Sequence, residues 1–192
     1  GDDGAANQIG MAPGARWIGC RNMDQGNGTP TTYAECYQWF VAPTDLNNLN
    51  PDPALAPDVI NNSWSCPGSE GCTDPNVLLT VVENVRAAGI VTVHSAGNDG
   101  SSCSTVSTPS AIYDASFTVG STTSTDAASS FSSRGPVTVD GSNRMKPDIA
   151  APASPKPMPA AAHGHVKLDR VSFAYPGAEG VSLNGVSFEA KP

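Results

Sequence analysis

Residues Val91–Gly100 read VTVHSAGNDG, and this stretch decides how the rest of the chain is interpreted. The β-branched residues in Val91–Val93 favour an extended backbone, whereas Ala96 and Gly97 remove side-chain bulk where the strand ends. Asn98 therefore follows a strand end, where the site residues of α/β folds often lie. An Asn amide there can donate a hydrogen bond to an oxygen that gains negative charge during acyl transfer. Spacing alone favours the simpler interpretation that Asn98 is a turn residue.

Four further blocks accompany this stretch along the chain. They are GMAPGA at Gly10–Ala15, DVINNSWS at Asp58–Ser65, FSSRGP at Phe131–Pro136 and KPDIAAP at Lys146–Pro152. Together with SAGN at Ser95–Asn98 they resemble, in the same order, the core of subtilisin-like serine peptidases. Five blocks in one order are far more specific than any one block. The resemblance implies an α/β fold of subtilisin type with a partial doubly wound parallel sheet.

The same resemblance implies roles for residues around a substrate cleft. Asn98 is expected to be the oxyanion-hole donor, and the expected partner is a peptide or protein substrate. The substrate-binding walls are expected to contain Ser63, Trp64, Ser65, Ser95, Ala96 and Gly97. The family also implies a secreted or extracellular parent protein and a calcium site. The GDDGAANQ stretch is only loosely similar to the family's calcium loop, so the resemblance assigns no calcium ligand.

The catalytic triad is the part of the family pattern that the sequence does not show. The mechanism needs a nucleophilic Ser, a His that takes its proton, and a carboxylate that orients the His. The family's Asp and His blocks would precede this chain, and Ala153 stands where the family has glycine, with no GTSMA-like segment after it. Strand alternation puts His94 on the face opposite Ser95, so we interpret His94 as a core residue. The sequence therefore predicts a peptidase fragment that is inactive in proteolysis alone.

A different pattern follows residue 152. ASPKPMPAAA at residues 153–162 predicts a stiff Pro/Ala linker between a peptidase core at 1–152 and a C-terminal part at 163–192. Alternating runs at Val166–Tyr175 and Val181–Ala190 predict a β-hairpin. With VSFAYPG at residues 171–177, this hairpin resembles the opening strands of ABC transporter nucleotide-binding domains, where the aromatic residue matching Tyr175 stacks on adenine. We interpret Tyr175 here as a packing residue of the hairpin. The chain has no G-x-x-x-x-G-K-[ST] loop, so we expect no ATPase function and interpret the chain as a chimera.

Two other classes of function stay open. His163 and His165 stand at i and i+2, so on a strand both imidazoles would project from one face. They could hold zinc with an acidic side chain such as Asp2, Asp3 or Asp169, and support metal-assisted hydrolysis of an ester or phosphoester. A solvated linker end is the simpler interpretation of this pair. The other class is a non-catalytic module that binds an extended peptide by strand addition.

Composition and charge argue against some classes of binding partner. The chain of 192 residues has a formal net charge of −8, which argues against nucleic acid and anionic membranes as partners. No apolar run is long enough to span a bilayer, and GDDGAANQ lacks the basic and apolar regions of a signal peptide.

The chain has five cysteines, at positions 20, 36, 66, 72 and 103. Cys66 and Cys72 bracket the short PGSEG loop and could close a small disulfide, and Cys20 with Cys36 could form a second one. Cys103 would then be left over, although the sequence does not fix the pairing. A zinc cluster is disfavoured, because no C-x-x-C spacing occurs.

The residue patterns predict strands and helices in alternation. Strands are expected over Arg16–Arg21, Asp58–Trp64, Ile90–Ser95 and Ser116–Ser121. Helices are expected over Thr31–Val41 and from Asp74 to Gly89, the second with an apolar face of Val77, Leu78, Val81, Val82 and Val85. This order predicts a parallel sheet that lacks outer strands, and exposed sheet edges predict self-association.

Overall fold

The computed structural model describes residues 12, 14–152, 166–173 and 183–190, and for the last two ranges it describes the backbone alone. The chain divides into two compact units, Trp17–Pro155 and the remainder, which we treat separately. The larger unit contains two α-helices, α1 (Pro30–Val41) and α2 (Leu79–Ala87), and two short 3₁₀ helices, η1 (Pro53–Leu55) and η2 (Gly68–Glu70). Its four strands are β1 (Val59–Asn62), β2 (Val91–Ser95), β3 (Ser116–Thr122) and β4 (Ile149–Pro152).

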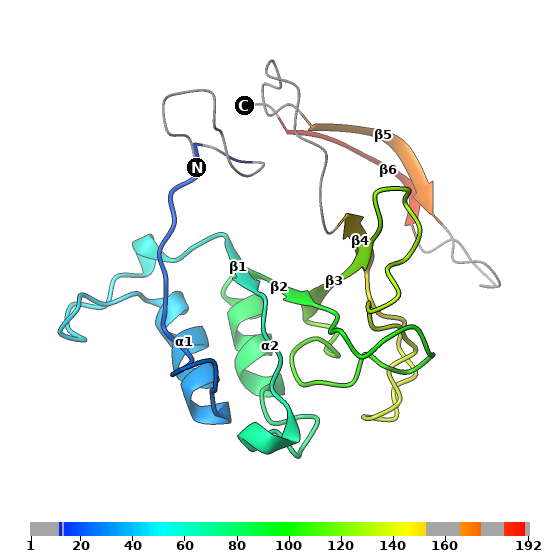
Figure 1. The fold of residues 1–192 in the computed structure, drawn as a ribbon. Helices are drawn as coiled ribbons and strands as arrows, with labels where there is room; N and C mark the ends of the chain where they lie inside the picture. Colours follow the sequence, from blue (N-terminus) through cyan, green and yellow to red (C-terminus); the bar gives the residue numbers. More distant parts are fainter. Residues whose placement is uncertain (1–11, 13, 153–165, 174–182, 191–192) are drawn as a thin grey trace. The chain divides into compact units, whose positions relative to one another are not determined.

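The four strands form one parallel sheet in the order β1-β2-β3-β4 (Figure 1). Asn62 lies opposite His94, Ser95 opposite Val119, and Thr122 opposite Pro152. The carboxyl ends of all four strands therefore meet at one edge of the sheet. This arrangement confirms the predicted α/β fold with a parallel sheet.

Helix α1 begins one residue before the predicted Thr31 and ends at the predicted Val41. Thr29 is the N-cap and forms a capping box with Thr32, and Pro30 occupies the first turn, where its missing N–H costs nothing. Tyr33 and Tyr37 lie one turn apart and are both buried, so the predicted helical face is the face that packs.

Helix α2 begins five residues later than predicted. Residues 75–78 form a turn, because the Val77 N–H donates to the Asp74 carbonyl and the Leu78 N–H donates to the Tyr113 hydroxyl. Val82 and Val85 are buried as expected, whereas Val77 is exposed. The predicted helix end is confirmed, since Gly89 has a φ of +88°, the left-handed conformation that ends many helices.

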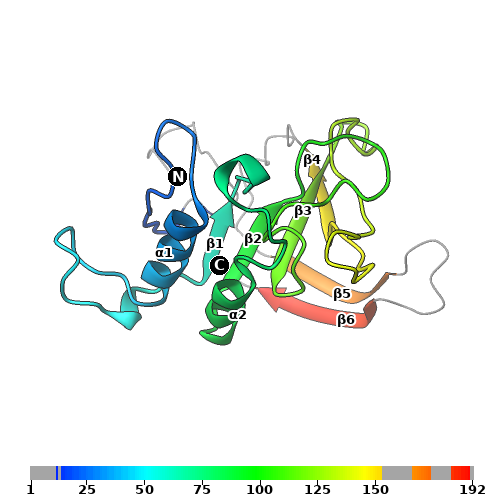
Figure 2. The same ribbon diagram turned by 90° about the horizontal axis from the view of Figure 1, so that it is seen from below.

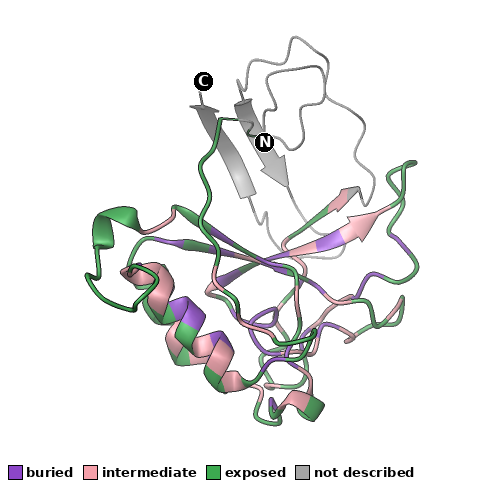
Figure 3. Cartoon of the chain, turned by 60° about the vertical axis from the view of Figure 1, so that its left-hand side comes forward, coloured by how far each residue is buried: buried purple, intermediate pink, exposed green. Residues whose placement is uncertain are grey.

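Both helices pack on the same face of the sheet (Figures 1 and 2). Side chains on that face, among them Ile60, Thr92 and His94, are buried between the sheet and the helices. The opposite face carries exposed apolar side chains: Val59, Val91, Phe117 and Ile149. Figure 3 shows this change of burial along the strands. The described part of the sheet is therefore covered on one side.

One element prediction is wrong, and one strand was not predicted. Arg16–Arg21 is not a strand: Trp17 is 87% exposed, and the segment is tied to α1 by the Cys20–Cys36 disulfide. Strand β4 was not predicted, because IAAP is short and ends in proline, which suits an edge position only. The second disulfide joins Cys66 to Cys72, and Cys103 is free and exposed, so the suggested pairing is confirmed.

The smaller unit contains β5 (Val166–Phe173) and β6 (Leu183–Ala190), which pair antiparallel with Val166 opposite Ala190. The pairing agrees with the predicted hairpin strands. His163, His165 and Tyr175 lie outside the described residues, as do Gly10, Met11 and Pro13 of the GMAPGA block. No helix in the described ranges is long and apolar enough to cross a membrane.

Candidate functional site

The two predicted site segments meet at the carboxyl edge of the sheet. Ser63–Ser65 directly follows β1, and Ala96–Asn98 directly follows β2. Because Asn62 and His94 are register partners, both segments leave neighbouring strands at the same level. The structure thus brings together the SWS and SAGN blocks, which are about thirty residues apart in the sequence.

The turn after β2 is fixed by backbone hydrogen bonds at both ends. The Ala96 N–H donates to the Val119 carbonyl of β3 at 2.9 Å, which extends the sheet pairing by one residue. The Gly100 N–H donates to the Phe131 carbonyl at 2.9 Å. The turn between these points is therefore held against β3 and against the FSSRGP block.

Ser133 holds the centre of the same turn. Its N–H donates to the Gly97 carbonyl at 3.1 Å, and its hydroxyl Oγ accepts a hydrogen bond from the Asp99 N–H at 3.0 Å. Gly97 has a φ of +101°, and a Cβ at this position would lie 2.9 Å from Ser133 Oγ. Glycine is thus required here both by the backbone conformation and by the close approach of Ser133.

Asn98 lies between these two contacts with an exposed side chain. Within the described residues its amide forms no hydrogen bond to another group, so the amide is free to meet a ligand. The backbone on both sides of Asn98 is therefore held while its side chain faces solvent.

The wall segment after β1 is built around Trp64. Its ring stacks on Tyr33 of α1 with ring centroids 4.0 Å apart, and its indole Nε1–H donates to Asn62 Oδ1 at 3.2 Å. The Tyr33 hydroxyl donates to Glu70 Oε2 at 2.6 Å, and burial together with this carboxylate raises the pKa of Tyr33. Trp64 therefore packs against the core, whereas Ser63 and Ser65 on either side of it are exposed.

His94 is not part of this edge. Its side chain is 1% exposed on the helix-covered face, and Nε2 lies 2.7 Å from the Tyr37 hydroxyl oxygen. Burial, reinforced by the positive charge of Lys146, lowers the pKa of His94 to about 3. The imidazole is therefore neutral at ordinary pH and sealed from solvent, which confirms its interpretation as a core residue.

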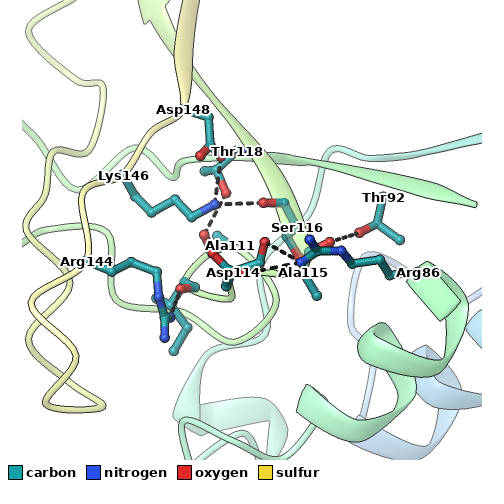
Figure 4. Close-up of polar contacts among 11 residues, drawn as sticks. Arg86, Thr92, Ala111, Asp114, Ala115, Ser116, Thr118, Arg144, Lys146 and Asp148 are labelled. Carbon is teal, nitrogen blue, oxygen red and sulfur yellow. Dashed lines mark hydrogen bonds and ion pairs between the residues drawn. The ribbon is translucent and has the colours of Figure 1, made fainter. Parts of the chain in front are cut away.

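Lys146 anchors the KPDIAAP block to β3 (Figure 4). This side chain is 4% exposed, and its Nζ donates to the Ser116 carbonyl at 2.7 Å and to Asp148 Oδ2 at 2.6 Å. The same Asp148 oxygen accepts the Thr118 N–H at 2.6 Å. The block therefore fixes β4 beside β3.

Sequence reasoning missed the roles of Ser133 and Lys146. Both lie in blocks that the sequence had singled out, FSSRGP and KPDIAAP, so the blocks were the available signal. Their function as supports depends on contacts with residues 97–99 and 116–118, and no local pattern encodes such contacts.

The described residues contain no group of three or more His, Cys, Asp or Glu side chains placed to hold a metal ion. His163, His165, Asp2 and Asp3 lie outside these residues, and the side chain of Asp169 is not described. The zinc and calcium predictions therefore stay predictions.

Comparison with known proteins gives consistent results. The subtilase family (Peptidase S8) matches residues 1–188. Bacillopeptidase F of Bacillus subtilis (strain 168) is 37% identical over 150 residues, which are 76% of this chain and 10% of that protein. Serine protease AprX of the same organism is 34% identical over 157 residues, covering 74% of this chain and 32% of that protein. The chain thus spans a third or less of the length of these relatives.

Comparison with solved structures finds a similar fold. The epidermin leader peptide processing serine protease (EpiP) from Staphylococcus aureus superimposes with a TM-score of 0.53 at 20% identity, over 75% of this chain and 35% of that chain. At this identity the likeness concerns the fold alone. On the family match and the identity to its relatives, this chain belongs to the subtilase family.

Proposed function

We propose that this chain is part of a subtilisin-like serine endopeptidase domain that supplies the oxyanion-hole amide and two substrate walls. The triad is not part of its contribution, so it does not cleave peptide bonds alone. The observation that carries the proposal is the turn at Gly97–Asp99, held by Ser133 with Asn98 exposed between its contacts. This turn lies at the same sheet edge as Ser63–Ser65.

Asn98 would act on the carbonyl oxygen of a bound substrate. When a nucleophile adds to the carbonyl carbon of the substrate, the carbonyl oxygen gains negative charge. The Asn98 side-chain N–H would donate a hydrogen bond to this oxygen. A preorganised donor of this kind stabilises the transition state by roughly 3 to 4 kcal/mol. Ser63–Ser65 and Ser95–Gly97 would line the extended peptide on either side, with Ser63, Ser65 and Ser95 exposed to it. Ala96 is buried, and its N–H and the Gly97 carbonyl are already bonded to Val119 and Ser133, so these two backbone groups would support the wall without pairing with the peptide.

A general base for a serine nucleophile is the part that the described residues do not supply. His94 is buried, bonded to Tyr37 and on the opposite face of β2 from Ser95. A serine hydroxyl without a placed base is a weak nucleophile. An oxyanion hole and binding alone still give roughly 1000-fold acceleration over water, so slow hydrolysis of an activated ester is expected.

Hydrolysis of a p-nitrophenyl ester and of a peptide p-nitroanilide by the purified chain tests the proposal. We expect no peptide cleavage and no labelling by a serine-directed phosphonate. Asn98→Ala should lower the ester rate by about 100-fold, towards the uncatalysed rate. Asn84→Ala, an exposed Asn on α2, is the matched control and should leave the rate unchanged. Stoichiometric phosphonate labelling of one serine would contradict the inactive assignment.

The same experiment separates the alternatives. A peptide-binding module would bind an extended peptide without cleavage and would keep that affinity in Asn98→Ala; its support is the exposed wall at the sheet edge. The metal-assisted hydrolase rests on the His163/His165 spacing alone. Metal analysis of untagged protein with no stoichiometric zinc, and a rate unaffected by chelator, would remove it.

The origin of the chain is a further part of the proposal. Residues 163–192 resemble ABC transporter strands, which supports a chimera of a secreted peptidase core and a second family. The family match to residues 1–188 covers the same segment, so the two interpretations compete. Sequencing of the source gene on both sides decides between them, since a complete subtilase domain there would exclude the chimera.

A further inference from the structure

We infer that Ser133 is the positioning residue of Asn98, the residue that holds its backbone and so sets the direction of its Cα–Cβ bond. This inference rests on the proposed oxyanion role of Asn98 and extends it to a residue that contacts no substrate. Two peptide groups flank Asn98: one contains the Gly97 carbonyl and the other contains the Asp99 N–H. Ser133 binds both of them.

The geometry leaves Asn98 little freedom in its backbone. The Gly97 carbonyl accepts the Ser133 N–H at 3.1 Å, and the Asp99 N–H donates to Ser133 Oγ at 3.0 Å. Fixing both neighbouring peptide planes fixes φ and ψ of Asn98, and therefore the direction of its Cα–Cβ bond. The side chain retains only its own rotamers.

Ser133 is itself immobilised. It is fully buried, and its neighbour Arg134 is held by Thr105, whose Oγ1 accepts the Arg134 N–H at 2.8 Å. The single hydroxyl proton of Thr105 is within hydrogen-bond reach of the Gly100 carbonyl at 3.2 Å, at the far end of the Asn98 turn, and of the Ser102 carbonyl at 3.1 Å. The contacts therefore form a ring: the Asn98 turn contacts Ser133, the adjacent Arg134 contacts Thr105, and Thr105 contacts the end of the same turn at Gly100. A site held this way depends on its supporting groups as well as on the group that acts.

Gly97 provides independent support for this role. Its left-handed conformation places the backbone where a Cβ would lie 2.9 Å from Ser133 Oγ, so serine hydroxyl and glycine fill one shared space. This close approach leaves the turn little room to move away from Ser133.

Ser132 is the matched control. It is 5% exposed, and its Oγ also accepts one backbone N–H, that of Ser121 at 2.9 Å. Ser132→Ala and Ser133→Ala thus remove the same atom, at adjacent buried positions, from hydrogen bonds of similar length. The first change affects β3, and the second affects the Asn98 turn.

Solution NMR of the isotope-labelled chain tests the inference. The wild-type chain should show a coupling across the hydrogen bond from Ser133 N to the Gly97 carbonyl carbon, a result that requires no variant to fold. Ser133→Ala should speed hydrogen exchange of the Asp99 amide at least fivefold and shift the Asn98 side-chain amide signals. Ser132→Ala should leave both within twofold of wild type and affect the Ser121 amide instead.

The inference is overturned if the coupling is absent, or if Ser133→Ala changes the Asn98 signals no more than Ser132→Ala does. Ester hydrolysis distinguishes this failure from failure of the proposed function. We expect Ser133→Ala to lower kcat about tenfold with KM unchanged. If Asn98→Ala loses ester hydrolysis activity and Ser133→Ala does not, the positioning role alone is contradicted. If Asn98→Ala loses no activity, the oxyanion role is contradicted, and the NMR result is not affected.

Discussion

His94 and Asn98 lie four residues apart in the sequence and have opposite environments. His94 points to the helix-covered face, where it contacts Tyr37 and lies edge-on to Trp64. Asn98 lies beyond the strand end, where the chain turns and the side chain is exposed. Strand alternation explains why His94 is buried, and the turn that requires Gly97 explains why Asn98 is exposed. Two polar residues of one short segment therefore serve the core and the candidate site, respectively.

The stability of the protein should depend on pH through His94. Its pKa is about 3 in the folded chain and about 6.5 in the unfolded chain, so the unfolded state binds the extra proton between these values. The stabilisation is complete above about pH 6.5 and is lost as the pH falls towards 3. By pH 4 the loss should reach about 3 kcal/mol, a large part of a typical folding free energy.

Urea unfolding of the wild type and of His94→Gln between pH 8 and pH 4 measures this effect. Gln keeps a hydrogen-bond partner for the Tyr37 hydroxyl but does not titrate, whereas the carboxylates and Lys146 are present in both proteins. The advantage of the wild type over the variant should shrink by about 3 kcal/mol across this range. Parallel pH curves for the two proteins would show that His94 is not the group responsible.

At the scale of elements, the sequence predicted what local patterns encode. The apolar spacing in α1, the β-branched run of β2 and the helix-ending Gly89 each indicate their element without outside contacts. The start of α2 was predicted five residues too early, because a hydrogen bond from Leu78 to Tyr113, thirty-five residues away, keeps the preceding turn out of the helix.

In the candidate site, too, the sequence predicted some residues and missed those that act through distant contacts. Its two segments, Ser63–Ser65 and the turn with Asn98, were predicted from blocks of sequence, and the structure places them at one edge of the sheet. Their supports were not predicted, because Ser133 and Lys146 act on strands and turns distant in sequence. A serine in a serine-rich segment, or a lysine beside proline, has no local feature that marks it as buried.

Lys146 should be the main anchor of β4. Removing its ammonium group leaves the Ser116 carbonyl without that donor and Asp148 without its cation, so Lys146→Met should destabilise the protein by about 3 kcal/mol. The exposed pair Arg86–Asp114 in Figure 4 is the matched control, with side chains 59% and 84% exposed. Arg86→Met should cost less than about 1 kcal/mol.

Urea unfolding at pH 7 compares the two variants directly. Equal destabilisation by both substitutions would mean that the Lys146–Asp148 pair contributes no more than a surface ion pair, and that β4 is held by strand pairing with β3 alone.

At the scale of the whole chain, we expect behaviour in solution to depend on the sheet face opposite the two helices, because its apolar side chains are exposed in the described part of the larger unit. Val59, Val91, Phe117 and Ile149 are between 41% and 55% exposed on that side. Parallel sheets are normally covered on both faces, and a contiguous apolar surface of this kind favours association. The net charge of −8 opposes it through repulsion between copies.

We therefore expect self-association that grows with protein concentration and with salt, since salt screens the repulsion. Sedimentation velocity at low and high ionic strength measures it. The double variant Val91→Thr, Phe117→Thr should be monomeric at concentrations where the wild type associates. Val139→Thr, at an exposed position outside the strands, should behave as wild type. A wild type that is monomeric in high salt at every concentration would contradict this prediction.

The single free thiol gives this chain a ready attachment point for a reporter group. Cys103 is exposed, whereas the other four cysteines are joined in disulfides. It lies in the loop between Gly100 and Thr105, whose two ends are bonded to each other next to the Asn98 turn. A maleimide dye would therefore attach at one position without mutagenesis, and its emission would report the arrival of a peptide at the sheet edge in real time.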